Sequence, residues 1–212
     1  IIEDGWCKLA QNLNKLSISP ENGNFTYLDD DKKIIVGKSD PNNINYDEII
    51  FANRDVKEID VPSEIKAIRS YAFSSCKKIG TITFSENSQL EIIGNGAFCN
   101  SSLASIYIPS SVREIGHFCF IFCFSLNKVL FSKDSQLCSI GQNAFEQSML
   151  RNIKLPKKLQ KIDKKMFYFC KNLQTIYFPK SLKSSLHTIS QSAFENSSLL
   201  SISIPSYVDK IE

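Results

Sequence analysis

The residues of this 212-residue chain that could do chemistry are concentrated at His117, Cys119 and Cys123. One imidazole and two thiolates are ligands that Zn²⁺ prefers, and a thiolate beside an imidazole can act as a nucleophile. The spacing does not match a paired Cys-x-x-Cys arrangement, however, and the positions in between carry side chains typical of a hydrophobic core. Those side chains are Phe118, Phe120, Ile121 and Phe122. We therefore predict a structural role for this stretch, and neither a metal site nor a thiol-enzyme site.

Three of the seven cysteines recur at a fixed interval. Cys76, Cys123 and Cys170 are separated by 47 residues, so they are equivalent positions two units apart in a stack of repeats. Neighbouring strands of a stack lie about 4.8 Å apart, which places these cysteines about 10 Å from one another, beyond the Cα separation of about 7 Å that a disulfide permits. We predict that they are reduced core residues. The sequence leaves open the redox state of three others, Cys7, Cys99 and Cys138.

No other motif in the sequence indicates catalysis. His187, the second of two histidines, has no evident acidic or thiol partner in the sequence. Glycine-rich phosphate loops, nucleotide-binding motifs and a catalytic serine motif are absent from the sequence. We therefore predict no catalytic residue, no cofactor and no metal ion, and we expect a binding function.

The elements that position these residues are copies of one pattern. It has the form Leu-x-x-Ile-x-Ile and continues with two apolar residues three positions apart. A Phe lies five positions after the second of these two residues, and the whole pattern recurs every 23 to 26 residues. The copies begin at Val56, Ile79, Leu103, Leu126, Leu150, Leu173 and Leu199. Six full units and the start of a seventh are present. A repeat of this period predicts a solenoid in which stacked units bury one another's apolar side.

Each unit contains one predicted strand and one predicted turn region. The first five or six residues of the pattern predict a short strand with inward residues at positions one, four and six. Later stretches such as 94–98 and 141–145 are expected to turn the chain and begin a short helical segment whose Phe points inward. The predicted fold is thus an α/β solenoid with a parallel, concave β-sheet and short helical turns on the convex side.

The repeat resembles a known family in its detail. The segment Ile108-Pro-Ser-Ser-Val-Arg-Glu-Ile-Gly, followed by Phe120-x-x-Cys123-x-x-Leu126, is similar to the leucine-rich repeats of the BspA-like, or Treponema pallidum-type, class. It lacks the Asn or Cys that common leucine-rich repeats carry shortly after the strand. The resemblance covers residues 56–212 and, more loosely, the N-terminal quarter. It implies a horseshoe-like interaction domain, often on cell surfaces of anaerobic bacteria and parasitic protists, associated with adhesion and without catalytic residues.

The resemblance and the pattern divide the chain into two parts. Residues 1–55 are predicted to be a degenerate repeat with a β-hairpin insertion, and 56–212 one continuous solenoid of leucine-rich repeats. In the first part, Leu13-x-x-Leu16-x-Ile18 repeats the strand pattern and Trp6 could be its inward aromatic. Alternating apolar residues on both sides of the polar turn 29–32 predict a hairpin, and 47–51 a third strand. Because Ile1 is not a start Met and the last unit is incomplete, we expect a fragment of a longer array.

The candidate binding surface is the exposed face of the predicted sheet. Residues between the inward positions of each strand project from this face and form columns from one unit to the next. Amphipathic aromatic side chains on a rigid sheet suit a partner-binding surface, although they could equally be a simple cover for the sheet. The candidates are Tyr107, Leu130, Lys154 and Tyr177 in one column and Lys128, Asn152 and Thr175 in its neighbour.

Charge is unevenly distributed, although the net charge is only +3. Residues 1–64 contain 13 acidic and 7 basic side chains, a balance of −6, whereas 150–183 contain ten basic residues and a single acidic one, Asp163. The basic segment could attract an acidic protein, a sulfated glycan or an anionic membrane, or be a solvated flank. We define as the basic flank Lys157, Lys158, Lys161, Lys164 and Lys165. Nucleic acid is not expected, because no nucleic-acid-binding module accompanies these charges.

Composition and the remaining motifs bear on where the protein acts. No apolar run approaches the roughly 20 residues of a membrane span, so membrane association is expected only through segments outside this sequence. Glycosylation sequons begin at Asn24, Asn100 and Asn196, and whether they are used is left open. We predict a non-enzymatic adhesion module that recognises a protein or glycan of a host or neighbouring cell, at the cell surface or secreted. The alternative is a cytoplasmic scaffold for protein interactions, which reduced cysteines would equally allow.

Overall fold

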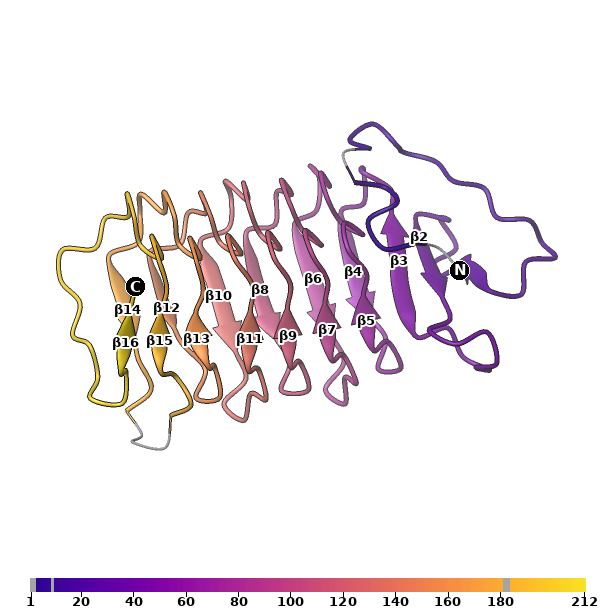
Figure 1. Cartoon of the computed structure of the whole chain (residues 1–212). Coiled ribbons are helices and arrows are strands. Elements are labelled where there is room, and N and C mark those ends of the chain that lie inside the picture. Colours follow the sequence, from indigo (N-terminus) through magenta and orange to yellow (C-terminus); the bar gives the residue numbers. More distant parts are fainter. Residues whose placement is uncertain (1–2, 9, 181–183) are drawn as a thin grey trace.

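The computed structural model describes residues 3–8, 10–180 and 184–212 and shows an elongated solenoid (Figure 1). The N-terminal strands lie at one end of the stack, and β16 (Lys210–Ile211) lies at the other. Each unit contributes one longer strand, one two-residue strand and one turn region. The solenoid of stacked parallel strands is therefore confirmed.

The longer strands stack beside one another as three hydrogen-bonded pairs, and we call them together the first sheet, which is the predicted one. They are β4 (Glu58–Val61), β6 (Thr81–Phe84), β8 (Ser105–Ile108), β10 (Lys128–Phe131), β12 (Asn152–Lys154) and β14 (Thr175–Tyr177). All hydrogen-bonded pairs among them are parallel and in register. Along each strand, apolar residues face the core and the residues between them face solvent, so the period-two alternation of the sequence explains which side is buried.

A second parallel sheet lies on another side of the solenoid and was not predicted. Its first ladder contains β3 (Glu48–Ala52), β5 (Ala67–Ile68), β7 (Ile92–Ile93), β9 (Glu114–Ile115) and β11 (Ser139–Ile140). A second ladder of β13 (Lys161–Ile162), β15 (Thr188–Ile189) and β16 lies next to β11 and continues the stack. Its strands contain the second residue of the apolar pair of each unit, such as Ile115 and Ile140, which are buried. Each unit therefore donates backbone hydrogen bonds to its neighbours on two sides.

The prediction of helical turns is wrong, because the described residues contain no helix. Residues four apart in each turn region have left-handed backbone conformations, for example Gly96 at φ 58° and Asn100 at φ 57°. Alternate backbone N–H groups of the turn region donate to carbonyls of the next unit: Phe98 N donates to the Cys119 carbonyl at 2.9 Å, and Asn100 N donates to the Ile121 carbonyl. Left-handed residues interrupt an α-helix, and hydrogen bonds between units replace those within a helical turn.

Close packing between successive units is visible at three glycines. A Cβ built on Gly141 would lie 2.5 Å from the backbone nitrogen of His117, and those built on Gly94 and Gly116 would meet backbone atoms of the preceding unit almost as closely. These glycines directly follow the second-sheet strands β7, β9 and β11. The absence of a side chain lets consecutive turns approach within hydrogen-bonding distance.

The core contains a ladder of phenylalanine rings, one from each unit. The rings are those of Phe73, Phe98, Phe120, Phe145, Phe167 and Phe194. Neighbouring rings are nearly parallel, with centroid distances from 5.2 to 5.7 Å. The first five are fully buried, so the prediction that this Phe points inward is confirmed. Phe118 and Phe122 are instead 39% and 36% exposed, which corrects the expectation that they belong to the core.

The N-terminal region continues the second sheet. Strand β1 (Phe25–Tyr27) pairs antiparallel with β2 (Ile34–Gly37), β2 pairs antiparallel with β3, and β3 pairs parallel with β5. Residues 13–18 form no strand, contrary to the expectation from their sequence. There the Tyr27 hydroxyl takes the place of a neighbouring strand, donating to the Leu16 carbonyl at 2.9 Å and accepting from Ile18 N. Trp6 is 40% exposed and packs only partly, against Phe51.

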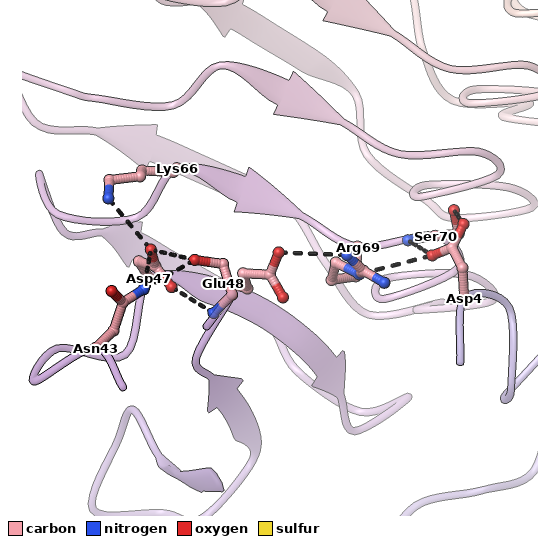
Figure 2. Close-up of polar contacts among 8 residues, drawn as sticks. Asp4, Asn43, Asp47, Glu48, Lys66, Arg69 and Ser70 are labelled. Carbon is pink, nitrogen blue, oxygen red and sulfur yellow. Dashed lines mark hydrogen bonds and ion pairs between the residues drawn. The ribbon is translucent and has the colours of Figure 1, made fainter. Parts of the chain in front are cut away.

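Polar contacts fasten the first residues and β3 to β5 (Figure 2). Asp4 accepts hydrogen bonds from the hydroxyl and the backbone N–H of Ser70, and Arg69 lies between Asp4 and Glu48, at 3.7 and 3.3 Å. Asp47 is buried and receives hydrogen bonds from Ser39 and an ion pair from Lys66 at 3.3 Å. Burial opposes the charge of Asp47, but the Ser39 and Lys66 contacts outweigh it and lower the pKa of this carboxyl. Burial raises the pKa of Glu48.

The seventh unit is incomplete in structure as well as in sequence. Residues 201–204 form no strand, and Ile202 and Ile204 are 38% and 39% exposed. Only the second-sheet strand β16 forms, by pairing with β15. The first sheet therefore ends at β14.

Candidate binding surface

His117, Cys119 and Cys123 do not come together as a site. His117 is exposed, and its Nδ1 accepts a hydrogen bond from Gln142 N at 2.9 Å. Cys119 and Cys123 are fully buried. Within the described ranges, no three His, Cys, Asp or Glu side chains are grouped as metal ligands. The other histidine, His187, has an acidic neighbour that the sequence did not reveal, Asp209 at 3.7 Å.

The regular cysteines are core residues, as predicted. Cys76, Cys123 and Cys170 are fully buried, and all seven cysteines are free thiols. The Cys123 thiol donates to the Phe98 carbonyl at 3.0 Å, and Cys170 makes the same contact with Phe145. Burial raises the pKa to about 11 for Cys76 and Cys170 and to about 12 for Cys123, which makes these thiols poor nucleophiles at neutral pH. Cys7 is also buried, whereas Cys99 and Cys138 are partly exposed.

The columns on the first sheet form as the sequence indicated. Tyr107 pairs in register with Leu130, and Lys154 with Tyr177, while Ser105 aligns with Lys128 and Asn152 with Thr175. Their large apolar side chains are exposed, 51% for Tyr107, 46% for Leu130 and 53% for Tyr177. The inward residues Ile106, Val129 and Ile153 are buried and Ile176 packs against the core, so the backbone holds these side chains on one face.

A groove crosses this face at β10 and β12, and we call it the lysine groove. Its volume is about 460 Å³. Five predicted residues line it: Lys128, Leu130, Asn152, Lys154 and Lys157. Lys180, one of the ten basic residues of 150–183, also lines it, and residues that the sequence reasoning missed complete it, chiefly Phe131, Lys133, Leu155, Pro156 and Pro179. Lys133, Pro179 and Lys180 belong to the loops after the strands, where the repeat varies in length. That variation in length is the feature of the sequence that could have pointed to them.

A second depression lies at the other end of the same strands. It has a volume of about 610 Å³ and shares Lys128 and Asn152 with the lysine groove. Phe124 and Met149, which are 57% and 40% exposed, line it together with Arg151. Arg151 is one of the ten basic residues of 150–183, whereas the sequence did not single out Phe124 and Met149. The two depressions make the β10–β12 surface hollowed at both ends, with apolar side chains in each.

The remaining predicted residues lie outside the groove. Tyr107, Tyr177 and Thr175 flank it on the same face. The basic-flank lysines have different surroundings: only Lys157 lines the groove, Lys158 bonds to Gln136, and Lys161 pairs with Asp163 at 3.0 Å. Lys165 lies 4.8 Å above the Tyr168 ring, and Lys164 is exposed on its own. Of the other basic residues in 150–183, Lys183 lies outside the described residues.

The sequon asparagines differ in accessibility. Asn24 and Asn196 are exposed, whereas Asn100 is partly buried and accepts a hydrogen bond from Lys77 at 2.6 Å.

Stacked units of this period, with a parallel sheet that presents exposed columns, define a leucine-rich-repeat protein. The chain belongs to the family described as BspA type Leucine rich repeat region, six copies of which match residues 42–137 and 91–212. The resemblance drawn from the repeat pattern is thereby confirmed. Proteins of this class are typically non-enzymatic binding scaffolds. No curated protein matches the sequence.

Solved structures share the fold. A leucine-rich repeat protein from Eubacterium ventriosum superposes with a TM-score of 0.71 at 22% identity, covering 99% of this chain and 54% of that one. One from Bacteroides ovatus gives 0.60 at 25% identity, covering 79% and 49%. The T. pallidum leucine-rich repeat protein gives 0.57 at 23% identity, covering 76% and 82%. The chain thus spans about half the length of the Eubacterium and Bacteroides proteins.

Proposed function

We propose that this protein is a non-enzymatic adhesion module that recognises a protein or glycan of a host or neighbouring cell through the face of its first sheet. The observation that carries the proposal is the row of half-exposed side chains Tyr107, Leu130 and Tyr177 beside the lysine groove. Aromatic side chains with little rotational freedom, held on a rigid backbone, are the residues that contribute most to recognition. Family membership supports a binding role and a location at the cell surface or outside the cell.

The chemistry of the chain agrees with binding rather than catalysis. The regular cysteines Cys76, Cys123 and Cys170 are buried and have raised pKa values, so they are poorly suited to act as nucleophiles. The exposed face offers instead apolar side chains, lysines and an amide, which bind but do not by themselves supply an acid–base pair. No helix of the described residues is long and apolar enough to cross a membrane.

The test combines a binding assay with labelling of intact cells. The recombinant chain is presented to arrays of host extracellular proteins and of glycans, together with a variant carrying Tyr107→Ala, Leu130→Ala and Tyr177→Ala. The proposal expects at least one ligand that the parent binds and the variant binds at least about tenfold more weakly. Equal binding of parent and variant to every ligand contradicts the use of this face. Biotinylation of the native protein on intact cells tests its location.

A cytoplasmic scaffold is the second candidate, and one observation favours it. All seven cysteines are free, and free thiols are more common in reducing compartments than outside the cell. Such a scaffold would use the same exposed face, so mutation of this face does not separate the two candidates. Failure to label the protein on intact cells, with labelling after lysis, would support the scaffold.

A further inference from the structure

The lysine groove has a charge of a single sign. Five lysines line it, from three successive units: Lys128, Lys133, Lys154, Lys157 and Lys180. None of its lining residues is Asp or Glu. Among the described residues, none of the five lysines forms an ion pair, whereas Lys161 nearby is paired with Asp163. The like charges repel one another, and a negatively charged group that enters the groove relieves this repulsion. The groove therefore favours an anionic ligand.

The groove is also apolar between these charges. Leu130 is 46% exposed and lines it, and Val129, Phe131, Leu155, Pro156 and Pro179 complete the apolar lining. Apart from the lysines, the polar side chains of the lining are Asn152, Ser132 and Ser135. A ligand that fits this lining has carboxylates that pair with the lysines and an apolar side chain that contacts residues such as Leu130.

We propose that the lysine groove binds an acidic segment of a partner protein, with one apolar side chain seated on Leu130 and carboxylates between the lysines. This inference rests on the proposed function and names the partner class for part of the same face. A sulfated glycan would match the charge but would bury its hydroxyls against an apolar lining with few hydrogen-bonding groups. Lysine ammonium groups are compact, mobile charges, suited to the varied positions of carboxylates along a peptide.

The charge distribution of the whole chain also favours binding of an acidic segment at the lysine groove. Residues 1–64 have a balance of −6 from 13 acidic and 7 basic side chains, and they lie at the opposite end of the sequence from the groove. The two first-sheet columns both change sign along the stack, one from Asp60 on β4 to Lys154 on β12 and the other from Glu58 on β4 to Lys128 on β10. An acidic segment is therefore repelled at the N-terminal units and attracted to the groove.

The experiment uses fluorescence anisotropy with a labelled decapeptide of Asp and Glu that has one central Leu. A second peptide carries Ser in place of Leu, and a heparin decasaccharide represents sulfated glycans. The groove variants are Lys128→Gln with Lys154→Gln, and separately Leu130→Ser. The matched control is Lys78→Gln with Lys164→Gln, which removes the same charge from exposed lysines outside the groove. Circular dichroism verifies that each variant is folded.

We expect the Leu peptide to bind the parent with an affinity that falls as salt rises. Removing the two groove lysines weakens binding about tenfold, Leu130→Ser or the Ser peptide weakens it several-fold, and the control pair changes it less than about twofold. The inference is overturned by equal losses in the groove and control variants, or by heparin binding more tightly than the Leu peptide without dependence on Leu130. It is also overturned if sedimentation shows that the groove lysines only mediate self-association. In each of these cases, ligand binding that still depends on Tyr107 and Tyr177 leaves the proposed function intact.

Discussion

Tyr107 lies directly beside Leu130 in the parallel register of β8 and β10, and both side chains are about half exposed. Their strands hold the neighbouring Ile106 and Val129 in the core, so neither exposed side chain can turn inward without a register shift. The same relation holds for Lys154 and Tyr177 on β12 and β14. The register of the strands thus fixes which side chains are exposed on this face.

The phenylalanine ladder is expected to dominate stability. Phe145 is fully buried between Phe120 and Phe167, at centroid distances of 5.4 and 5.6 Å. Phe145→Ala should lower the free energy of unfolding by about 3 to 5 kcal/mol, because it opens a cavity in the interface between units. Urea denaturation measures this, with Phe124→Ala at an exposed position as the control. A denaturation midpoint equal to that of the parent would show that the phenylalanine ladder does not stabilise the stacked units.

The close approach of successive turns makes a second prediction. A Cβ at position 141 would lie 2.5 Å from the backbone of His117, whereas at Gly80 the nearest atom would be 3.9 Å away. Gly141→Ala should therefore cost about 1 to 3 kcal/mol, and Gly80→Ala little. Thermal melting of both variants tests this. Equal melting temperatures would mean that the units are less tightly apposed than the hydrogen bonds between them indicate.

Thiol reactivity reports which cysteines are in the core. In the native protein at pH 8, a disulfide-exchange reagent should spare Cys76, Cys123 and Cys170 and should react first with the partly exposed Cys99 and Cys138. With a pKa of about 12, Cys123 has about one thiolate in 10⁴ at that pH, in addition to being inaccessible. Mass spectrometry after labelling identifies the sites. Rapid modification of the three buried cysteines before denaturation would contradict their inward orientation.

Asp47 is expected to make stability dependent on acid pH. Its pKa is lowered in the folded protein relative to the unfolded value of about 3.9, so its contribution is present above that pH and is lost as pH falls through the folded pKa. Asp47→Asn should cost about 1 to 3 kcal/mol at pH 7 and progressively less below about pH 4, since it disrupts the Ser39 and Lys66 contacts.

Melting curves from pH 7 down to pH 3 test this dependence. Asp134→Asn, at an exposed position, is the control and should follow the parent at every pH. A constant difference between Asp47→Asn and the parent across the series would show that the charge of Asp47 is not what stabilises the contacts with β5.

Much of the fold could be predicted because one pattern recurs. Repetition at positions such as Phe98, Phe120 and Phe145 identifies inward residues better than any single unit could, and the alternation around Tyr107 indicates which side chains are exposed. The turn region was predicted wrongly because apolar residues three apart are also typical of a helix. The left-handed conformations at Asn100, Asn143 and other non-glycine residues leave no comparable signature in the sequence.

The candidate site was predicted in part. Lys128, Leu130 and Lys154 lie within the regular strands, so their alignment followed from the repeat. Pro179 and Lys180 reach the groove from an irregular joint, whose path depends on tertiary packing rather than on the repeat. Within the basic flank, the adjacent residues Lys157 and Lys158 have different surroundings, since Lys157 lines the groove and Lys158 bonds to Gln136.

The most direct test of the central claim is surface plasmon resonance of a captured ligand against folded variants of the first-sheet face. Tyr107→Ala with Tyr177→Ala should weaken binding by more than about 1 kcal/mol, while replacing the flank residues Lys158, Lys161, Lys164 and Lys165 with Glu should change it much less. Binding that survives the tyrosine changes but is abolished by the flank changes would contradict the account. Binding indifferent to both sets would place the site elsewhere.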